Sequence, residues 1–137
     1  MTEKKITRVM DVMTKGVITV EPTAPVSEAV RLMREHRTSS IVVERRDETD
    51  EFGLIVVTDI ASEVLGKDLS PDRVNVYEIM SKPVMTLAAE MNVVYAVRMV
   101  SRFKLTRALV VDPERNPLGI VTLRDMVLRS LKDGEGA

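Results

Sequence analysis

In the first half of the chain, the spacing of apolar residues switches between that of a strand and that of a helix. Short β-branched runs are bounded by prolines or charged residues, which is typical of strands that end in turns. Between them, apolar positions recur every three to four residues, as on one face of a helix. The predicted elements are a strand at 17–20, a helix capped by Ser27 with apolar positions 29, 30, 32 and 33, strands at 40–44 and 52–57 joined by the charged hairpin 45–51, and a closing helix at 59–65 that ends near Gly66.

The second half of the chain repeats this order. Four blocks of the first half match four blocks of the second half in the same sequence order, with one residue of difference in hairpin length. The matched blocks are 13–20 with 80–87, 26–33 with 93–100, 40–43 with 107–110, and 53–59 with 119–125. The second copy therefore predicts a strand at 84–87, a helix at 93–103, strands at 108–111 and 118–122 around the turn 112–117, and a helix at 124–131. The chain divides into repeat 1 (8–66), a linker (67–75), repeat 2 (76–131) and a disordered tail (132–137).

A duplication of this kind has a consequence for packing. One copy of about 60 residues forms a half-covered sheet that cannot bury its apolar face alone. Two copies packed sheet to sheet solve that problem, which predicts an α/β (α+β) fold with a pseudo-two-fold axis. Clefts between the copies, one for each repeat, are the expected ligand sites.

Composition and charge narrow the function classes. The net charge of −1 and an aromatic content of 3% disfavour nucleic-acid binding, although Arg98, Arg102, Lys104 and Arg107 form a local basic group. Cysteine is absent, His36 is the single histidine, and no nucleophile–base pair or Walker-type phosphate loop is present, so neither an enzyme nor a metal site is expected. No run of 18 apolar residues or signal-peptide pattern occurs, which makes a cytoplasmic location without membrane contact the expectation.

The repeat pattern resembles the cystathionine-β-synthase (CBS) domain pair, also called a Bateman module. The resemblance covers roughly residues 9–131. It depends on the Met-x-x-x-Val start of each repeat and on the Gly-hydrophobic-hydrophobic-Thr-x-x-Asp close at 119–125, with a weaker copy at 53–59. It implies a regulatory module that binds AMP, ADP or ATP without catalysis, that dimerises through its helices, and that acts on an effector protein not contained in this chain.

The resemblance also implies a ligand site in the second repeat. A carboxylate suits the ribose hydroxyls, and a hydroxyl at a strand-to-helix junction can reach phosphate beside helix N–H groups. Arginines add charge-assisted phosphate contacts, while adenine lies against the backbone of the first strand. The residues implied are Asp125, Thr122, Arg124, Arg107, Thr106, Leu105, Val84 and Met85.

The first repeat departs from this pattern. Asp59 is kept, but Val56, Ser40 and Thr58 stand where Thr122, Arg107 and Arg124 stand in the second repeat. A charge-assisted hydrogen bond to phosphate is roughly twice as strong as a neutral one, so we expect the first site to be the weaker one. The residues implied there are Asp59, Ser40, Ser39, Thr38, Val17 and Ile18.

Simpler interpretations stay open for several of these features. Thr122 and Asp125 also fit a helix-capping pattern, and His36 fits a favourable interaction with a helix C-terminus. The acidic residues of the first hairpin are most simply a solvated turn: Glu44, Asp47, Glu48, Asp50 and Glu51. S-adenosylmethionine or a dinucleotide is an alternative ligand, and a dimerisation or protein-interaction module with vestigial clefts is the alternative function.

Overall fold

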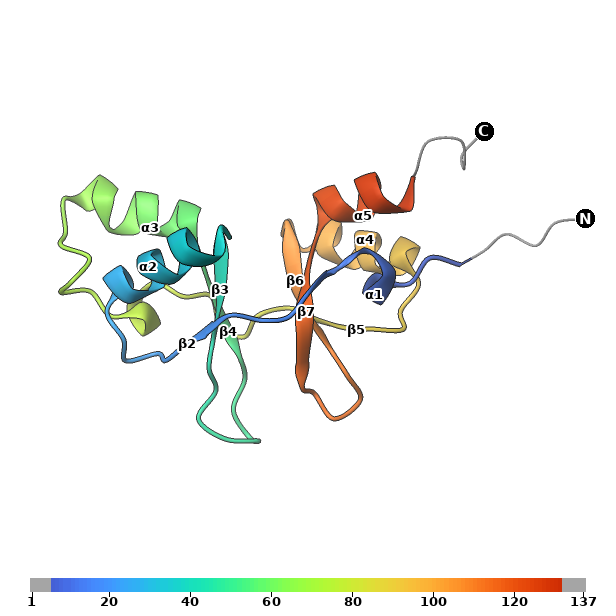
Figure 1. The fold of residues 1–137 in the computed structure, drawn as a ribbon, viewed down its shortest axis with the longest axis horizontal. Coiled ribbons are helices and arrows are strands. Elements are labelled where there is room, and N and C mark those ends of the chain that lie inside the picture. The colour runs from blue at the N-terminus through green and yellow to red at the C-terminus, as the bar shows by residue number, and fades with distance from the viewer. Residues whose placement is uncertain (1–5, 132–137) are drawn as a thin grey trace, which may run out of the picture. The chain divides into compact units, whose positions relative to one another are not determined.

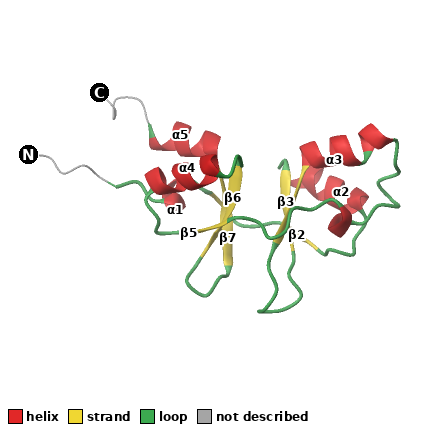
Figure 2. Ribbon diagram, turned by 180° about the vertical axis from the view of Figure 1, so that it is seen from behind, coloured by secondary structure: helices red, strands yellow, loops and turns green. Residues whose placement is uncertain are grey.

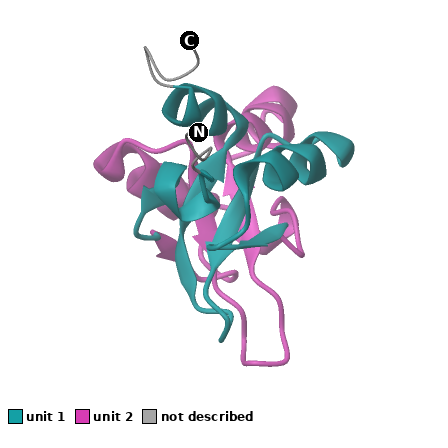
Figure 3. Cartoon of the chain, turned by 90° about the vertical axis from the view of Figure 1, so that its right-hand side faces the viewer, with its two compact units in different colours: residues 1–17, 85–137 teal, residues 18–84 magenta. Residues whose placement is uncertain are grey.

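The computed structural model describes residues 6–131, which form two compact units (Figures 1 and 3). Of the described residues, unit 1 comprises 6–17 and 85–131, and unit 2 comprises 18–84. The tail predicted at 132–137 lies outside the described residues.

Unit 2 is a three-stranded sheet with two helices on one face (Figure 2). The strands lie in the order β2 (Thr19–Val20), β3 (Ser40–Val43), β4 (Gly53–Val56); β2 is parallel and β4 antiparallel to β3. The helices are α2 (Val26–His36) and α3 (Val57–Glu63), followed by the 3-10 turns η1 (Leu65–Lys67) and η2 (Val76–Glu78). The core includes Val26, Ala29, Ile41, Val43, Ile55, Ile60, Val64 and Val76.

Unit 1 has the same plan with one more strand. Its sheet order is β1 (Thr14–Lys15), β7 (Pro117–Thr122), β6 (Arg107–Val111), β5 (Thr86–Ala88), with β5 parallel to β6 and the other pairs antiparallel. The helices are α1 (Val9–Val12), α4 (Val93–Arg102) and α5 (Leu123–Ser130). The core includes Val9, Val12, Leu87, Ala96, Val100, Ala108, Val110, Val121 and Met126.

The compact units and the sequence repeats divide the chain differently. The segment that precedes the sheet of each repeat packs on the unit of the other repeat: α1 and β1 belong to unit 1, and η2 belongs to unit 2. The Val9 N–H donates to the Met91 carbonyl at 2.8 Å, and the Val26 N–H donates to the Val74 carbonyl at 2.8 Å. Each unit is therefore completed by a segment from outside its own α–β–β–α stretch.

This crossing segment explains the glycine that begins the closing motif of each repeat. β1 pairs with β7 so closely that a Cβ on Gly119 would overlap the Thr14 carbonyl oxygen. In unit 2, Ser81 bridges Leu54, and a Cβ on Gly53 would lie 2.9 Å from the Met80 sulfur and 3.2 Å from the Ser81 carbonyl oxygen. A hydrogen in place of a side chain is what permits both approaches.

The predicted order of strands and helices is confirmed, and its boundaries need correction. Ser27 is not the cap of α2, because the helix begins at Val26, after Pro25 as N-cap, two residues earlier than a cap at Ser27 implies. His36 lies in the last turn of α2, as expected. The first strand of each repeat also differs from the predicted 17–20 and 84–87. β2 is shorter and β5 is shifted toward the C-terminus, because only these residues pair with β3 and β6. Helices α3 and α5 begin two residues and one residue earlier than predicted.

Candidate functional site

The predicted residues of the second repeat meet where β6 begins and β7 ends. Thr122 is the last residue of β7 and the N-cap of α5, and its Oγ1 accepts a hydrogen bond from the Asp125 N–H at 3.0 Å. Arg107, the first residue of β6, lies opposite Thr122 in the antiparallel ladder. The Leu123 N–H donates to the Thr106 carbonyl at 2.9 Å, which continues the pairing past the strand ends. Residues far apart in the sequence thus lie together where β6 begins and β7 ends, and we call this end of the two strands the edge of the sheet.

The polar groups at this edge combine one carboxylate with several cations. The Asp125 side chain is 25% exposed, and its Oδ1 lies 3.7 Å from Nε of Arg129. Thr106, Leu105 and Arg124 are exposed, while Arg107 is half-buried. The N-terminus of α5 adds backbone N–H groups and a partial positive charge, so this edge is able to bind an anionic group.

The structure confirms the capping interpretation of Thr122, and capping does not exclude ligand contact. The hydroxyl accepts one hydrogen bond from the helix and retains its own O–H donor and a second lone pair. Thr122 is half-buried rather than enclosed. The cap also fixes the first turn of α5, which holds the Asp125 backbone in place.

The remaining two residues of the predicted second site lie on either side of the boundary between the units. Met85 belongs to unit 1, and its carbonyl accepts from the Leu109 N–H at 2.9 Å, ahead of the first β5 pair. Val84 is buried in unit 2, where its N–H donates to the Phe52 carbonyl at 2.9 Å. The two backbones are each fixed by their own sheet.

The equivalent edge of unit 2 has the same backbone and different chemistry. Val56 is the N-cap of α3 and provides no side-chain cap, and the Val57 N–H donates to the Ser39 carbonyl at 2.9 Å, as at Thr106. Ser40 lies opposite Val56 in the ladder and is only 6% exposed. Asp59 is half-buried in the first turn of α3. This edge therefore lacks both the hydroxyl cap and the arginines.

The other residues predicted for this weaker site have backbone roles. The Thr38 hydroxyl lies within hydrogen-bonding distance of Ser40, donating to its carbonyl at 3.2 Å. The Ile18 carbonyl accepts from the Val42 N–H at 3.0 Å, which matches the role of Met85 in unit 1. Val17, its neighbour, is the last residue of the first segment of unit 1.

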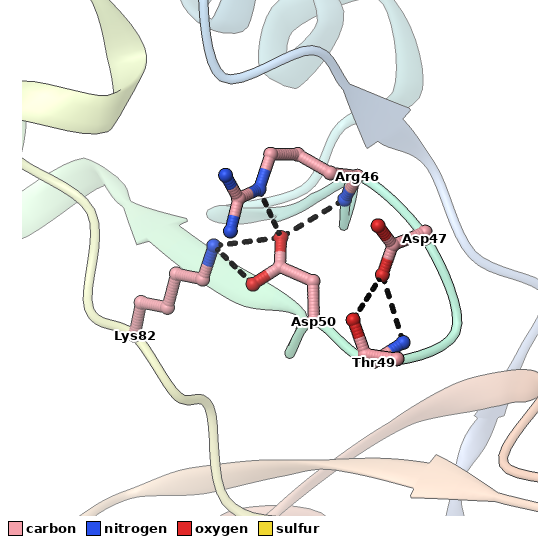
Figure 4. A network of polar contacts seen from close by, with 5 residues as sticks. All are labelled: Arg46, Asp47, Thr49, Asp50 and Lys82. Carbon is pink, nitrogen blue, oxygen red and sulfur yellow. Dashed lines mark hydrogen bonds and ion pairs between the residues drawn. The ribbon is translucent and has the colours of Figure 1, made fainter.

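One polar network was missed by the sequence interpretation (Figure 4). The sequence predicts Asp50 in a solvated turn, but its side chain is only 10% exposed. Its carboxylate accepts from the Arg46 backbone N–H at 2.9 Å and from Nζ of Lys82, which lies 2.9 Å from Oδ1 and 3.0 Å from Oδ2. The Arg46 N–H and the Lys82 ammonium hold the pKa of Asp50 far below its ordinary value. Lys82 is 32 positions away, so no local spacing in the sequence announces the pair.

The rest of that hairpin is solvated, as predicted. Asp47 is exposed, and its carboxylate accepts hydrogen bonds from the side chain and the backbone N–H of Thr49, which lower its pKa. Across residues 6–131, no group of three or more histidines and carboxylates is placed to hold a metal ion. No helix in the described part of the chain has the length and apolarity needed to cross a membrane.

Comparison with known proteins now adds to this geometry. The family model of the CBS domain matches the chain twice, at residues 9–66 and 76–132. The chain belongs to the CBS-domain family. The predicted family and the tandem CBS fold are thereby confirmed, and the hexameric CBS-CP12 protein from bloom-forming cyanobacteria is a solved example of similar structure. That protein is 33% identical with a TM-score of 0.86, over 91% of this chain and 72% of its own.

Two further relatives of this CBS pair bear on function. The CBS domain of the bacterial CNNM/CorC family Mg²⁺ transporter, solved in complex with ATP, is 27% identical with a TM-score of 0.71, over 88% of this chain and 84% of its own. Uncharacterized protein MK0525 of Methanopyrus kandleri is 35% identical over 118 residues, which is 85% of this chain and 59% of that protein. The chain spans 27% and 23% of the next two curated relatives, so the activities of those longer proteins do not transfer to it directly.

Proposed function

We propose that this CBS pair is a regulatory module that binds an adenine nucleotide, AMP, ADP or ATP, mainly at the second repeat and without catalysis. Its site would be the β6–β7–α5 edge. Asp125 would accept hydrogen bonds from the ribose, and Thr122, Arg124 and Arg107 would contact phosphate. A cytoplasmic location, where these nucleotides are abundant, is part of the proposal.

The observation that carries the proposal is a chemical difference between the β6–β7–α5 edge and the β3–β4–α3 edge, which have the same backbone arrangement. Arg107 lies opposite Thr122 across the β6–β7 ladder, whereas Ser40 lies opposite Val56 across the β3–β4 ladder. A structural capping role alone would not require an arginine at the partner position. The ATP complex of a CBS domain with the same fold supports the choice of ligand class.

Calorimetric titration of the full chain with AMP, ADP, ATP and S-adenosylmethionine tests the proposal. Replacing Asp125 with Ala should weaken nucleotide binding by at least about tenfold, because the ribose hydroxyls lose a charged acceptor. The backbone N–H that Thr122 caps is kept in that variant, so α5 should remain folded, which far-ultraviolet circular dichroism can check.

The first repeat offers a matched control. Asp59→Ala removes the equivalent carboxylate from the edge that lacks Thr122 and the arginines, and we expect a change in affinity of less than about twofold. An absence of heat with millimolar ligand would contradict nucleotide binding by this chain. Tighter binding of S-adenosylmethionine than of any nucleotide would favour the alternative ligand and contradict the phosphate role of the arginines, since they would then face a cation.

We also propose that the module works as a homodimer and passes its ligand state to an effector protein. Several large apolar side chains on helices of both units are exposed, among them Tyr95, Val127, Leu128 and Leu65. A hexamer among the structural relatives shows that this fold occurs in assemblies. If nucleotide binding fails while self-association holds, the interaction-module alternative becomes the better description.

A further inference from the structure

The two units carry net charges of opposite sign. Over residues 6–17 and 85–131, unit 1 has nine Lys and Arg against five Asp and Glu, a net charge of +4. Unit 2, over residues 18–84, has eight Lys and Arg against thirteen Asp and Glu, a net charge of −5. The overall charge of −1 hides this separation. Charge of one sign on each unit favours contact between unlike units of two molecules.

The exposed side chains of α4 and α5 in unit 1 are mainly apolar and basic. On α4, Tyr95, Arg98 and Arg102 follow one another at helical spacing and are exposed, and the Arg98 guanidinium lies 5.6 Å from the centre of the Tyr95 ring. On α5, which packs against α4, Val127 and Leu128 are exposed. The helix α4 contains no acidic residue. We call these five residues the basic face.

The equivalent positions of unit 2 differ in both charge and size. Glu28, Arg31 and Glu35 of α2 stand at the positions of Tyr95, Arg98 and Arg102. Arg31 contacts both glutamates at 2.6 Å, which leaves one uncompensated negative charge in the group. On α3, the small residues Ala61 and Ser62 stand at the positions of Val127 and Leu128, and both are exposed. We call these five residues the acidic face.

We infer that the basic face of one copy docks on the acidic face of a second copy, so that the homodimer pairs unlike units. This inference rests on the self-association proposed above and adds which surfaces meet. The large side chains of α5 would lie over the small residues of α3, and Arg98 and Arg102 would approach Glu28 and Glu35.

Pairing of like units is disfavoured by the same residues. Two basic faces in contact would bring Arg98 and Arg102 of one copy against the same arginines of the other, and like charges across an interface cost several kcal/mol. Two acidic faces would offer few large apolar groups to bury, since Ala61 and Ser62 are small. Contact between unlike faces avoids both of these costs.

Charge reversal in the full chain tests this arrangement by sedimentation velocity over micromolar concentrations. One variant carries Arg98→Glu and Arg102→Glu, and the other carries Glu28→Lys and Glu35→Lys. All four side chains belong to the exposed faces of helices, so the fold should persist, which circular dichroism checks. We expect each variant alone to dissociate at concentrations at least about tenfold above those of the wild type.

The single variants and their equimolar mixture together discriminate between the two arrangements. In the mixture, the charge-reversed basic face of one variant meets the charge-reversed acidic face of the other, and the two unchanged faces also meet. An equimolar mixture should therefore regain wild-type association. Wild-type association of either variant alone, failure of the mixture to recover, or a mixture that associates more tightly than the wild type would overturn the pairing of unlike units while leaving a homodimer in place. A wild-type chain that is monomeric throughout would overturn self-association itself and leave the nucleotide proposal standing.

Discussion

A methyl group at Gly119 is the substitution whose effect follows most directly from the structure. The backbone of Gly119 faces Lys15 in the β1–β7 ladder, and an added Cβ would overlap the Thr14 carbonyl oxygen and lie 3.0 Å from the Met13 sulfur. The φ of Gly119 lies outside the left-handed region, so an alanine there suffers a clash and no conformational strain. The clash is with backbone, which cannot rotate away as a side chain can.

The expected cost can be estimated from what must move. To admit the methyl group, β1 must shift away from β7, which weakens its two paired residues and the 2.9 Å hydrogen bond from the Gly16 N–H to the Leu118 carbonyl. Overpacking of this kind costs about 1–3 kcal/mol, and each hydrogen bond lost adds about 1 kcal/mol. We expect Gly119→Ala to lower the free energy of unfolding by about 3 kcal/mol.

Gly53 is the matched control, because it begins the same motif in the other repeat. There an added Cβ first meets the Met80 sulfur at 2.9 Å, and the end of a methionine side chain can rotate away. The cost of Gly53→Ala should be at most about 1 kcal/mol. Urea denaturation followed by circular dichroism measures both values. An equal or larger loss for Gly53→Ala would refute the distinction between a backbone and a side-chain contact, and an unchanged midpoint for Gly119→Ala would refute the assignment of Gly119 to close strand crossing.

Two further predictions concern the ends of α3 and α5 and the Asp50 network. Val56→Thr should supply the missing N-cap of α3 and raise the free energy of unfolding by about 1 kcal/mol, while Thr122→Val should lower it by a similar amount; denaturation midpoints that do not move in opposite directions would count against the equivalence of the two caps. Because folding lowers the pKa of Asp50, its stabilising effect is complete above the unfolded pKa of about 3.9 and is lost as the pH falls below it. Unfolding midpoints of wild type, Asp50→Asn and Lys82→Gln between pH 7 and 3 should show the largest acid-induced loss in the wild type, and parallel curves would exclude this ion pair as a cause.

The sequence predicted the elements and missed their partners. Apolar spacing identified every helix and strand of the two α–β–β–α stretches, because burial on one face repeats locally. It could not show that β1 pairs with β7 or that Ser81 bridges Leu54, since these pairings join segments far apart in the chain. The glycines of the closing motifs were recognised as a signature, and their physical cause became evident only with the crossing segment in place.

Side-chain roles divided in the same way. Thr122 as the cap of α5 was predictable, because its hydroxyl and the Asp125 N–H that it caps are only three residues apart. Ser27 was assigned a cap by the same rule and was wrong, since the hydrogen bond from Val26 to Val74 lets the helix begin earlier, after Pro25. Local sequence predicts Asp50 as solvated, because its partner Lys82 belongs to the segment that returns to unit 2 after the linker.

The exchange of segments between repeats explains why the first repeat, which lacks the hydroxyl and arginines of the second, still contributes to the stability of the fold. Val9 and Val12 are at most 1% exposed in the core of unit 1, although they precede the first repeat's own sheet. Val76, fully buried in unit 2, likewise precedes the second repeat's sheet. Removal of either repeat would therefore strip the remaining unit of a buried segment worth several kcal/mol of apolar burial, at about 1.5–3 kcal/mol for each fully buried side chain. The first repeat can lose its hydroxyl and arginines at the β4–α3 junction without affecting that contribution, because the two depend on different residues.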